Sequence, residues 1–170
     1  MSGMKCRIIG MAMLFILLLS FSVYGMNFTP EETFDSVVVV YTDVSVGSGF
    51  SVKENMIITN AHVVKDYKSV TVKLYDGTTV RGTVQKTDTE KDLALIEVDR
   101  KMVPLEISSD DLKIGQEVYA IGAPKDMTYT MTKGIISALD RKLRNNTYVQ
   151  IDASVNEGNS GGPLVDENGR

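Results

Sequence analysis

Residues 158–164 read Gly-Asn-Ser-Gly-Gly-Pro-Leu, and the interpretation of the whole chain starts from this stretch. Glycines on both sides of Ser160 permit tight backbone turns that leave the serine hydroxyl exposed. They also allow successive backbone N–H groups to converge on one point, as the oxyanion of a tetrahedral intermediate requires. A phosphate-binding loop is disfavoured because no lysine follows at the P-loop spacing. A plain glycine-rich turn stays open as the alternative.

The only histidine of the chain, His62, lies in the stretch Thr-Asn-Ala-His-Val-Val at residues 59–64. It follows the apolar residues 56–58, which we expect to form a strand. A histidine at the end of a strand can act as a general base, because its ordinary pKa of about 6.5 lets it exchange protons near neutrality. Taken alone, a single histidine among apolar residues is more often part of the core.

Asp92 precedes the apolar residues 93–96. An aspartate at the mouth of a strand can accept a hydrogen bond from an imidazole and hold the ring in one tautomer. The alternative is an ordinary turn residue at the start of a strand. Asp88 and Asp99 are nearby rivals for the same role.

His62, Asp92 and Ser160 follow one another at separations of 30 and then 68 positions. The chain order His, Asp, Ser is that of the chymotrypsin-like double β-barrel, whereas α/β-hydrolases begin with the serine and subtilisins with the aspartate. The order therefore favours a chymotrypsin-like architecture over the other two.

The pattern of residues after position 36 also indicates an all-β fold. This part is rich in Val, Ile, Thr and Tyr, with turn residues about every ten positions. Residues 70–74 alternate between apolar and polar, and Asp76-Gly77 predicts a hairpin turn before 79–81. Further strands are expected at 37–42, 93–98, 117–121, 129–139 and 148–151. Residues 102–115 predict a connector, and no stretch after residue 25 keeps a helical apolar period.

The first 25 residues have the pattern of an export signal. Lys5 and Arg7 precede the apolar residues 8–19, and no further charge occurs before Glu31. This pattern predicts a secretory signal peptide at 1–25 that ends near Gly25. A retained membrane anchor over residues 8–25 is the alternative, because 18 residues are close to the lower limit for crossing a bilayer. Both interpretations predict an extracytoplasmic location, whether periplasmic, secreted or membrane-anchored.

The composition excludes several classes of function. The chain has 170 residues, a net charge of −4 and no basic stripe, which argues against a nucleic-acid partner. Cys6 is the only cysteine, so a disulfide framework and a zinc site built from several Cys or His ligands are excluded.

Six short motifs resemble, in family order, the protease domain of the HtrA/Deg serine proteases. They lie at 47–50, 58–64, 92–95, 120–122, 132–138 and 158–164. The resemblance implies a protease domain at 26–170 built from two six-stranded antiparallel β-barrels, with the active site between them. Barrel 1 would occupy about 36–100, the linker about 101–115 and a partial second barrel about 116–170.

The resemblance also assigns roles to the candidate residues. His62 would be the general base, Asp92 the orienting carboxylate and Ser160 the nucleophile, and the N–H groups of Gly158 and Ser160 would form the oxyanion hole. The implied function is an exported serine endopeptidase that acts on misfolded or extracytoplasmic proteins. Polypeptides are the expected partners, no metal or organic cofactor is implied, and a homo-oligomer stays open.

Substrate preference and activation can be interpreted in part. The resemblance puts the base of the primary substrate pocket near Ser154 and Val155. Neither is acidic, so we expect cleavage after small or medium aliphatic residues rather than after Lys or Arg. Asn159 stands where animal trypsins have an aspartate that pairs with a new amino terminus, which makes activation by amino-terminal cleavage improbable. Glu157 replaces a residue that is commonly proline in the family.

The carboxyl-terminal residues predict an incomplete second barrel. Residues 164–165 resemble a strand and 166–169 an Asn-Gly hairpin turn, after which the chain ends at Arg170. About four strands are expected where the family has six, so we expect a C-terminally truncated protease that is poorly folded or nearly inactive. The alternative function is a non-catalytic protein of this fold that binds peptides without cutting them. A third alternative is a membrane-anchored structural fragment, but this function would not explain why the three motifs occur in the order His, Asp, Ser.

Overall fold

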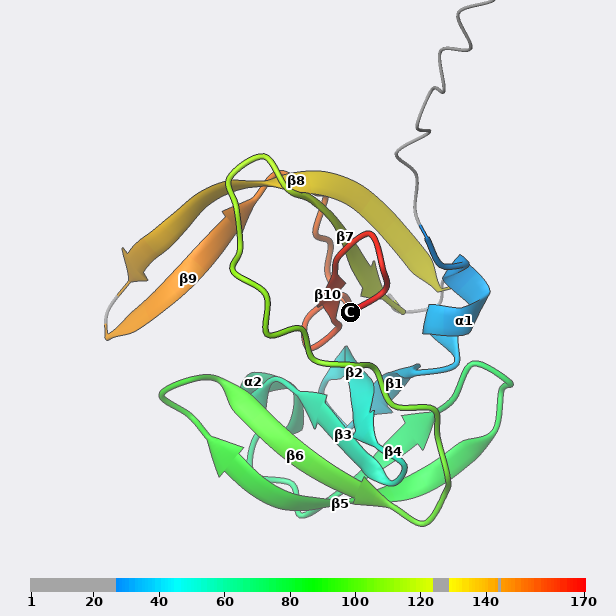
Figure 1. Cartoon of the computed structure of the whole chain (residues 1–170). Helices are drawn as coiled ribbons and strands as arrows, with labels where there is room; N and C mark the ends of the chain where they lie inside the picture. Colours follow the sequence, from blue (N-terminus) through cyan, green and yellow to red (C-terminus); the bar gives the residue numbers. More distant parts are fainter. Residues whose placement is uncertain (1–26, 124–128, 144) are drawn as a thin grey trace, which may run out of the picture.

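Strands dominate the structure, in agreement with the high content of β-branched residues. The computed structural model describes residues 27–123, 129–143 and 145–170. Within these ranges the strands form a closed barrel and a four-stranded sheet, and Figure 1 shows the sheet arching above the barrel. The predicted all-β fold is therefore confirmed, with one closed six-stranded barrel and a second half that contains four strands.

The closed barrel consists of six antiparallel strands in the order β1-β2-β3-β6-β5-β4. Their bounds are β1 (Val37–Tyr41), β2 (Val46–Lys53), β3 (Met56–Thr59), β4 (Ser69–Lys73), β5 (Thr79–Asp88) and β6 (Leu93–Val98). The alternating stretch forms β4 as predicted, because Val70 and Val72 are buried while Thr71 and Lys73 are exposed. This alternation places one face of the strand in the barrel core.

Pairing between β3 and β6 brings two distant parts of the sequence together. Thr59, the last residue of β3, lies opposite Ala94 of β6. The residues after Thr59 therefore lie close to those before Ala94. This register positions the stretch that contains His62 beside the stretch that contains Asp92.

The second half of the molecule is an antiparallel sheet with the strand order β10-β7-β8-β9. Its strands are β7 (Glu117–Gly122), β8 (Thr130–Leu143), β9 (Asn146–Ile151) and β10 (Leu164–Val165). The sequence predicted all four strands, although β8 and β9 are longer than the ranges expected for them.

An apolar core joins the barrel to the sheet. Val37 of β1 is fully buried and packs in one cluster with Tyr119, Ile121 and Val165 of the sheet. Beside it, the Tyr129 ring contacts those of Phe34 and Tyr75 at centroid distances of 5.6 and 4.9 Å. Burial raises the pKa of the Tyr129 phenol. The two halves are thus held together by hydrophobic burial, the main favourable term in folding.

Within the described ranges, two short helices occur that the apolar periodicity did not predict. Helix α1 (Pro30–Phe34) begins at Thr29, whose hydroxyl accepts the Glu32 N–H while the Glu32 carboxylate accepts the Thr29 N–H. Helix α2 (Ala61–Val64) follows β3 directly. The predicted signal peptide or anchor at 1–25 lies outside the described residues. Among those that are described, no helix combines the length and apolar character needed to cross a bilayer.

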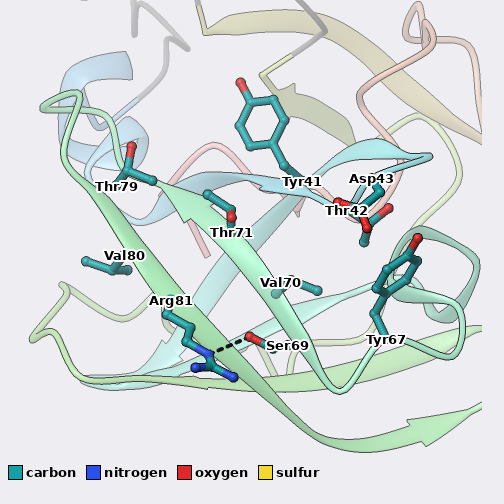
Figure 2. A pocket seen from close by; sticks show the side chains of 10 residues that line it. All are labelled: Tyr41, Thr42, Asp43, Tyr67, Ser69, Val70, Thr71, Thr79, Val80 and Arg81. Atoms are coloured by element: carbon teal, nitrogen blue, oxygen red, sulfur yellow. Dashed lines mark hydrogen bonds between the residues drawn. The ribbon is translucent and has the colours of Figure 1, made fainter.

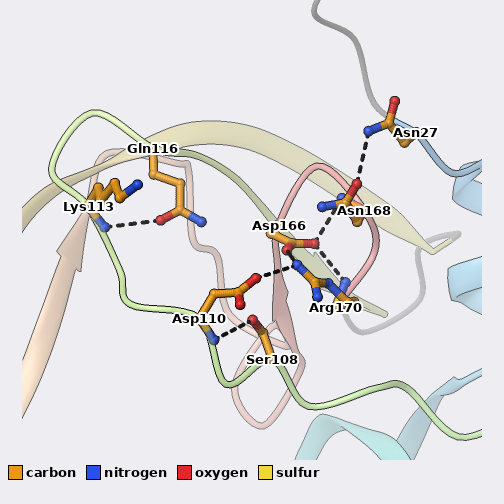
Figure 3. Close-up of polar contacts among 8 residues, drawn as sticks. All are labelled: Asn27, Ser108, Asp110, Lys113, Gln116, Asp166, Asn168 and Arg170. Carbon is orange, nitrogen blue, oxygen red and sulfur yellow. Dashed lines mark hydrogen bonds and ion pairs between the residues drawn. The ribbon is translucent and has the colours of Figure 1, made fainter.

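The carboxyl-terminal turn packs against the connector between the two halves. The Asp166 carboxylate accepts N–H groups from Asn168 and Arg170, and the Arg170 guanidinium pairs with both Asp166 and Asp110 (Figure 3). The predicted Asn-Gly turn is present, with Gly169 at a φ of +78°. These contacts tie residues 166–170 to the connector beside β10.

Candidate active site

His62 and Asp92 are in direct contact at the end of the barrel. His62 lies in α2, one turn beyond the strand end that the sequence predicted for it. Its ring Nδ1 is 2.7 Å from Oδ2 of Asp92, and its backbone N–H donates to Oδ1 of the same carboxylate at 2.9 Å. A carboxylate bound at both oxygens holds the ring and the helix turn together.

The backbone of Asp92 adopts an uncommon conformation at this position. Its φ is +56°, in the left-handed region that only a small fraction of non-glycine residues adopt. The Asn60 side-chain amide donates to the Asp92 carbonyl at 2.8 Å, so three hydrogen bonds from residues 60–62 hold Asp92 in place. Asp88 instead accepts the N–H of Lys91. Among the described residues, neither Asp88 nor Asp99 has a hydrogen bond to His62.

The contact with Asp92 determines what the other ring nitrogen of His62 can do. An ionised carboxylate only accepts hydrogen bonds, so Nδ1 carries the proton and Nε2 keeps a free lone pair. The His62 side chain is 55% exposed and that of Asp92 41%. A partly exposed imidazole in this tautomer can take a proton from a neighbouring hydroxyl.

The loop that contains Ser160 packs against the start of α2. Gly161 has a φ of +87°, and a Cβ there would overlap the Ser48 carbonyl oxygen and Thr59 Oγ1 and lie 3.0 Å from the Asn60 nitrogen. Ser160 therefore lies beside the residues that immediately precede His62, although the two are far apart in sequence. No hydrogen bond joins the Ser160 hydroxyl to the His62 ring within the described part of the chain. The backbone, rather than a side-chain bond, brings them together.

Some backbone N–H groups of the same loop are hydrogen-bonded within the loop and others are not. The Asn159 N–H donates to the Asn156 carbonyl at 3.1 Å and the Gly162 N–H to the Asn159 carbonyl at 2.9 Å. The N–H groups of Gly158 and Ser160 donate to no group among the residues described. Two free N–H groups spaced in this way are suited to stabilise a developing oxyanion.

The residues expected at the base of the substrate pocket lie between β9 and this loop. The Ser154 carbonyl accepts the Thr132 hydroxyl of β8 at 2.8 Å. Both Ser154 and Val155 are exposed, Val155 by 60%. Their contribution to a pocket stays a prediction.

Two buried polar residues of the site have surroundings that the sequence interpretation did not predict. Ser48 in β2 is fully buried, and its hydroxyl donates to the Gly158 carbonyl and accepts the Ala123 N–H. Asn159 is 7% exposed, and its side-chain amide has no partner in the structure described. The motif around Ser48 was visible in the sequence, but its contacts are with residues too distant for local patterns to reveal.

Other features are separate from this site. A hollow of about 480 Å³ lies along β4 and β5 beside the turn after β1 (Figure 2), and its lining includes none of His62, Asp92 and Ser160. Arg81 in this hollow donates to the Ser69 hydroxyl at 2.7 Å. In the described ranges, no group of three or more His, Cys, Asp or Glu side chains is arranged to hold a metal ion.

Comparison with known proteins gives consistent matches. A family model described as a trypsin-like peptidase domain matches residues 47–170. A probable periplasmic serine endoprotease DegP-like of Halomonas elongata is 43% identical over 131 residues, which cover 74% of this chain and 28% of that protein. Serine protease HTRA1B of Danio rerio is 44% identical over 137 residues, covering 74% of this chain and 29% of that protein.

A solved structure shares the fold. The HtrA-type protease AlgW with tripeptide is 34% identical and superposes with a TM-score of 0.75, covering 80% of this chain and 48% of that one. The chain spans less than a third of the length of the curated relatives described above.

Proposed function

The chain belongs to the HtrA/Deg family of trypsin-like serine proteases, and on this premise we propose that it carries the catalytic residues of an extracytoplasmic serine endopeptidase. The observation that carries the proposal is the bidentate contact between Asp92 and His62, with the Ser160 loop packed against the same helix turn. The Halomonas elongata relative is named periplasmic, which supports a location outside the cytoplasm.

In the proposed mechanism His62 is the general base. Nε2 takes the proton of the Ser160 hydroxyl while Oγ attacks the carbonyl carbon of the scissile peptide bond. Asp92 keeps the proton on Nδ1 and stabilises the imidazolium that forms. His62 then gives its proton to the leaving amine, and a water molecule hydrolyses the acyl-enzyme by the same steps.

The N–H groups of Gly158 and Ser160 are the proposed donors to the oxyanion. Both are free of protein partners among the described residues, so they need not break a bond to bind the substrate oxygen. In comparable sites each such donor contributes about 10²–10³ in rate.

Proteins are the proposed substrates, with cleavage after small or medium aliphatic residues. Supporting this, the segment proposed for the primary pocket contains Ser154 and Val155, which offer no counter-charge for Lys or Arg. The AlgW structure with its tripeptide is a relative with a peptide bound. A peptide library cleaved by the full-length protein should show Ala, Val or Leu before the cut, and a profile dominated by Lys or Arg would contradict the assignment.

A fluorophosphonate probe tests the proposal directly, because only an activated serine displaces its fluoride. We expect labelling of a full-length protein in which the second barrel is complete, and complete loss of labelling in Ser160→Ala. Ser109→Ala is the matched control, since Ser109 is an exposed connector serine and should leave labelling unchanged. Absent labelling, or labelling that survives Ser160→Ala, would overturn the endopeptidase and favour a peptide-binding protein without catalysis.

A further inference from the structure

The hydroxyl, the backbone N–H and the carbonyl of Ser48 are all hydrogen-bonded inside the protein. Its hydroxyl donates to the Gly158 carbonyl at 2.6 Å and accepts the Ala123 N–H at 2.8 Å. Its backbone N–H donates to the Ser160 carbonyl at 2.8 Å, and its carbonyl accepts the Thr59 hydroxyl at 2.6 Å. The residue is 0% exposed, so water cannot substitute for any of these partners.

The partners of Ser48 belong to the three segments that meet at the candidate active site. Gly158 and Ser160 lie in the nucleophile loop, Ala123 follows the end of β7, and Thr59 ends β3 just before α2. Ser48 itself belongs to β2 of the barrel. One residue of the barrel thus bonds to the nucleophile loop, to the end of β7 and to the end of β3 that leads into His62.

Both neighbours of Ser48 in β2 are glycines at positions where a side chain would meet closely packed atoms. A Cβ at Gly47 would lie 2.6 Å from a methyl carbon of Val63 and 3.0 Å from the Ser160 carbonyl oxygen. One at Gly49 would lie 2.9 Å from a methyl carbon of Ile57. Only the residue between them has room for a side chain, and that side chain points at the loop.

We propose that Ser48 is a positioning residue for the oxyanion hole, an inference that rests on the proposed function. It binds the carbonyls of Gly158 and Ser160 from the barrel side. These two bonds restrain the loop on either side of Asn159. With the loop restrained on both sides, the N–H groups of Gly158 and Ser160 are held in a fixed arrangement for the proposed oxyanion. Preorganised donors of this kind act chiefly on the transition state, so their loss lowers kcat more than it changes KM.

The experiment compares Ser48→Ala with Ser51→Ala. Ser51 is also in β2 and 0% exposed, but its hydroxyl donates to the Lys53 carbonyl at 2.7 Å, outside the nucleophile loop. Both variants lose a buried hydroxyl, and both should unfold at lower urea concentrations than the parent. Ser48→Ala removes the bond to the Gly158 carbonyl but keeps the backbone bond to Ser160. For this variant alone we expect kcat on a peptide substrate to fall by up to about 10²-fold, the cost of misplacing a catalytic group by about 1 Å, with KM nearly unchanged. The lower limb of the pH–rate profile should not move, because Ser48 does not touch His62 or Asp92.

The outcomes separate this inference from the function on which it rests. A full-length parent that turns over no peptide contradicts the endopeptidase itself. An active parent whose Ser48→Ala and Ser51→Ala variants have equal kcat overturns the positioning role alone. Ser48→Cys keeps the shape of the side chain, slightly enlarged, with a much weaker donor, and it should lose kcat in the same way. If Ser48→Ala does not fold, Ser48→Cys decides the question, and a parental kcat in that variant overturns the inference.

Discussion

Replacing Gly161 by alanine should destabilise the fold and disable the proposed site, although it removes no atom other than hydrogen. The φ of +87° is a left-handed conformation that costs an L-residue about 1–2 kcal/mol. The added Cβ would also overlap the Ser48 carbonyl oxygen and Thr59 Oγ1, both of which are already hydrogen-bonded in the interior. Overpacking of this kind costs about 1–3 kcal/mol. We expect the free energy of unfolding to fall by about 2–5 kcal/mol in total.

Gly77→Ala is the matched control for this substitution. Gly77 has a φ of +84°, but an added Cβ would meet nothing within 4 Å, so only the conformational cost of about 1–2 kcal/mol applies. Equilibrium urea unfolding measures both costs, and the rate of labelling by a fluorophosphonate probe measures the site. Gly161→Ala should label far more slowly than the parent and Gly77→Ala at the parental rate. Equal stability and equal labelling of the two variants would refute the close packing of the nucleophile loop against the start of α2.

Two further substitutions test the site and the carboxyl-terminal turn. Asp92→Asn should lower kcat by about 10⁴-fold with little change in KM, because a neutral amide no longer holds the proton on Nδ1 of His62. Steady-state peptide hydrolysis measures this loss. A decrease in kcat of less than about tenfold would contradict the role assigned to Asp92. Burial would raise the pKa of Asp166, but the N–H groups of Arg170 and Asn168 and the Arg170 guanidinium outweigh it and lower the pKa below the ordinary value. The stabilisation that this carboxylate provides is therefore present above about pH 4 and is lost as the pH falls through the folded-state pKa. Asp166→Asn should unfold more easily than the parent at pH 7, and the difference in urea midpoint should shrink steadily as the pH falls below about 4, whereas a difference independent of pH would show that the charge is unimportant.

Local sequence patterns predicted the parts of the molecule that depend on neighbouring residues. Alternation at 70–74 identified β4, and the Asp76-Gly77 pair identified the turn after it. Thr29 and Glu32 form a capping box whose Thr-x-x-Glu spacing is visible in the sequence. The helix α1 could therefore have been predicted from this signal, but its five residues are too few for apolar periodicity to reveal.

The arrangement of the candidate site depended on information that local patterns do not contain. His62 contacts Asp92, and among the described residues neither Asp88 nor Asp99 bonds to it, while the catalytic roles stay a prediction. The role of Ser48 could not be inferred in this way, because its hydroxyl reaches partners 110 and 75 positions away. Such contacts arise only when the barrel and the sheet have packed together.

The strand bounds of the barrel also have a consequence for biosynthesis. The barrel ends with β6 at Val98, and it already contains both His62 and Asp92. Because domains fold from the amino terminus during translation, a ribosome-bound chain can complete this barrel long before Ser160 is synthesised. A nascent chain of that length already contains the His62–Asp92 pair but not yet Ser160. The proposed nucleophile is therefore the last of the three residues to be synthesised, and the proposed site can be completed only after the barrel that supports it.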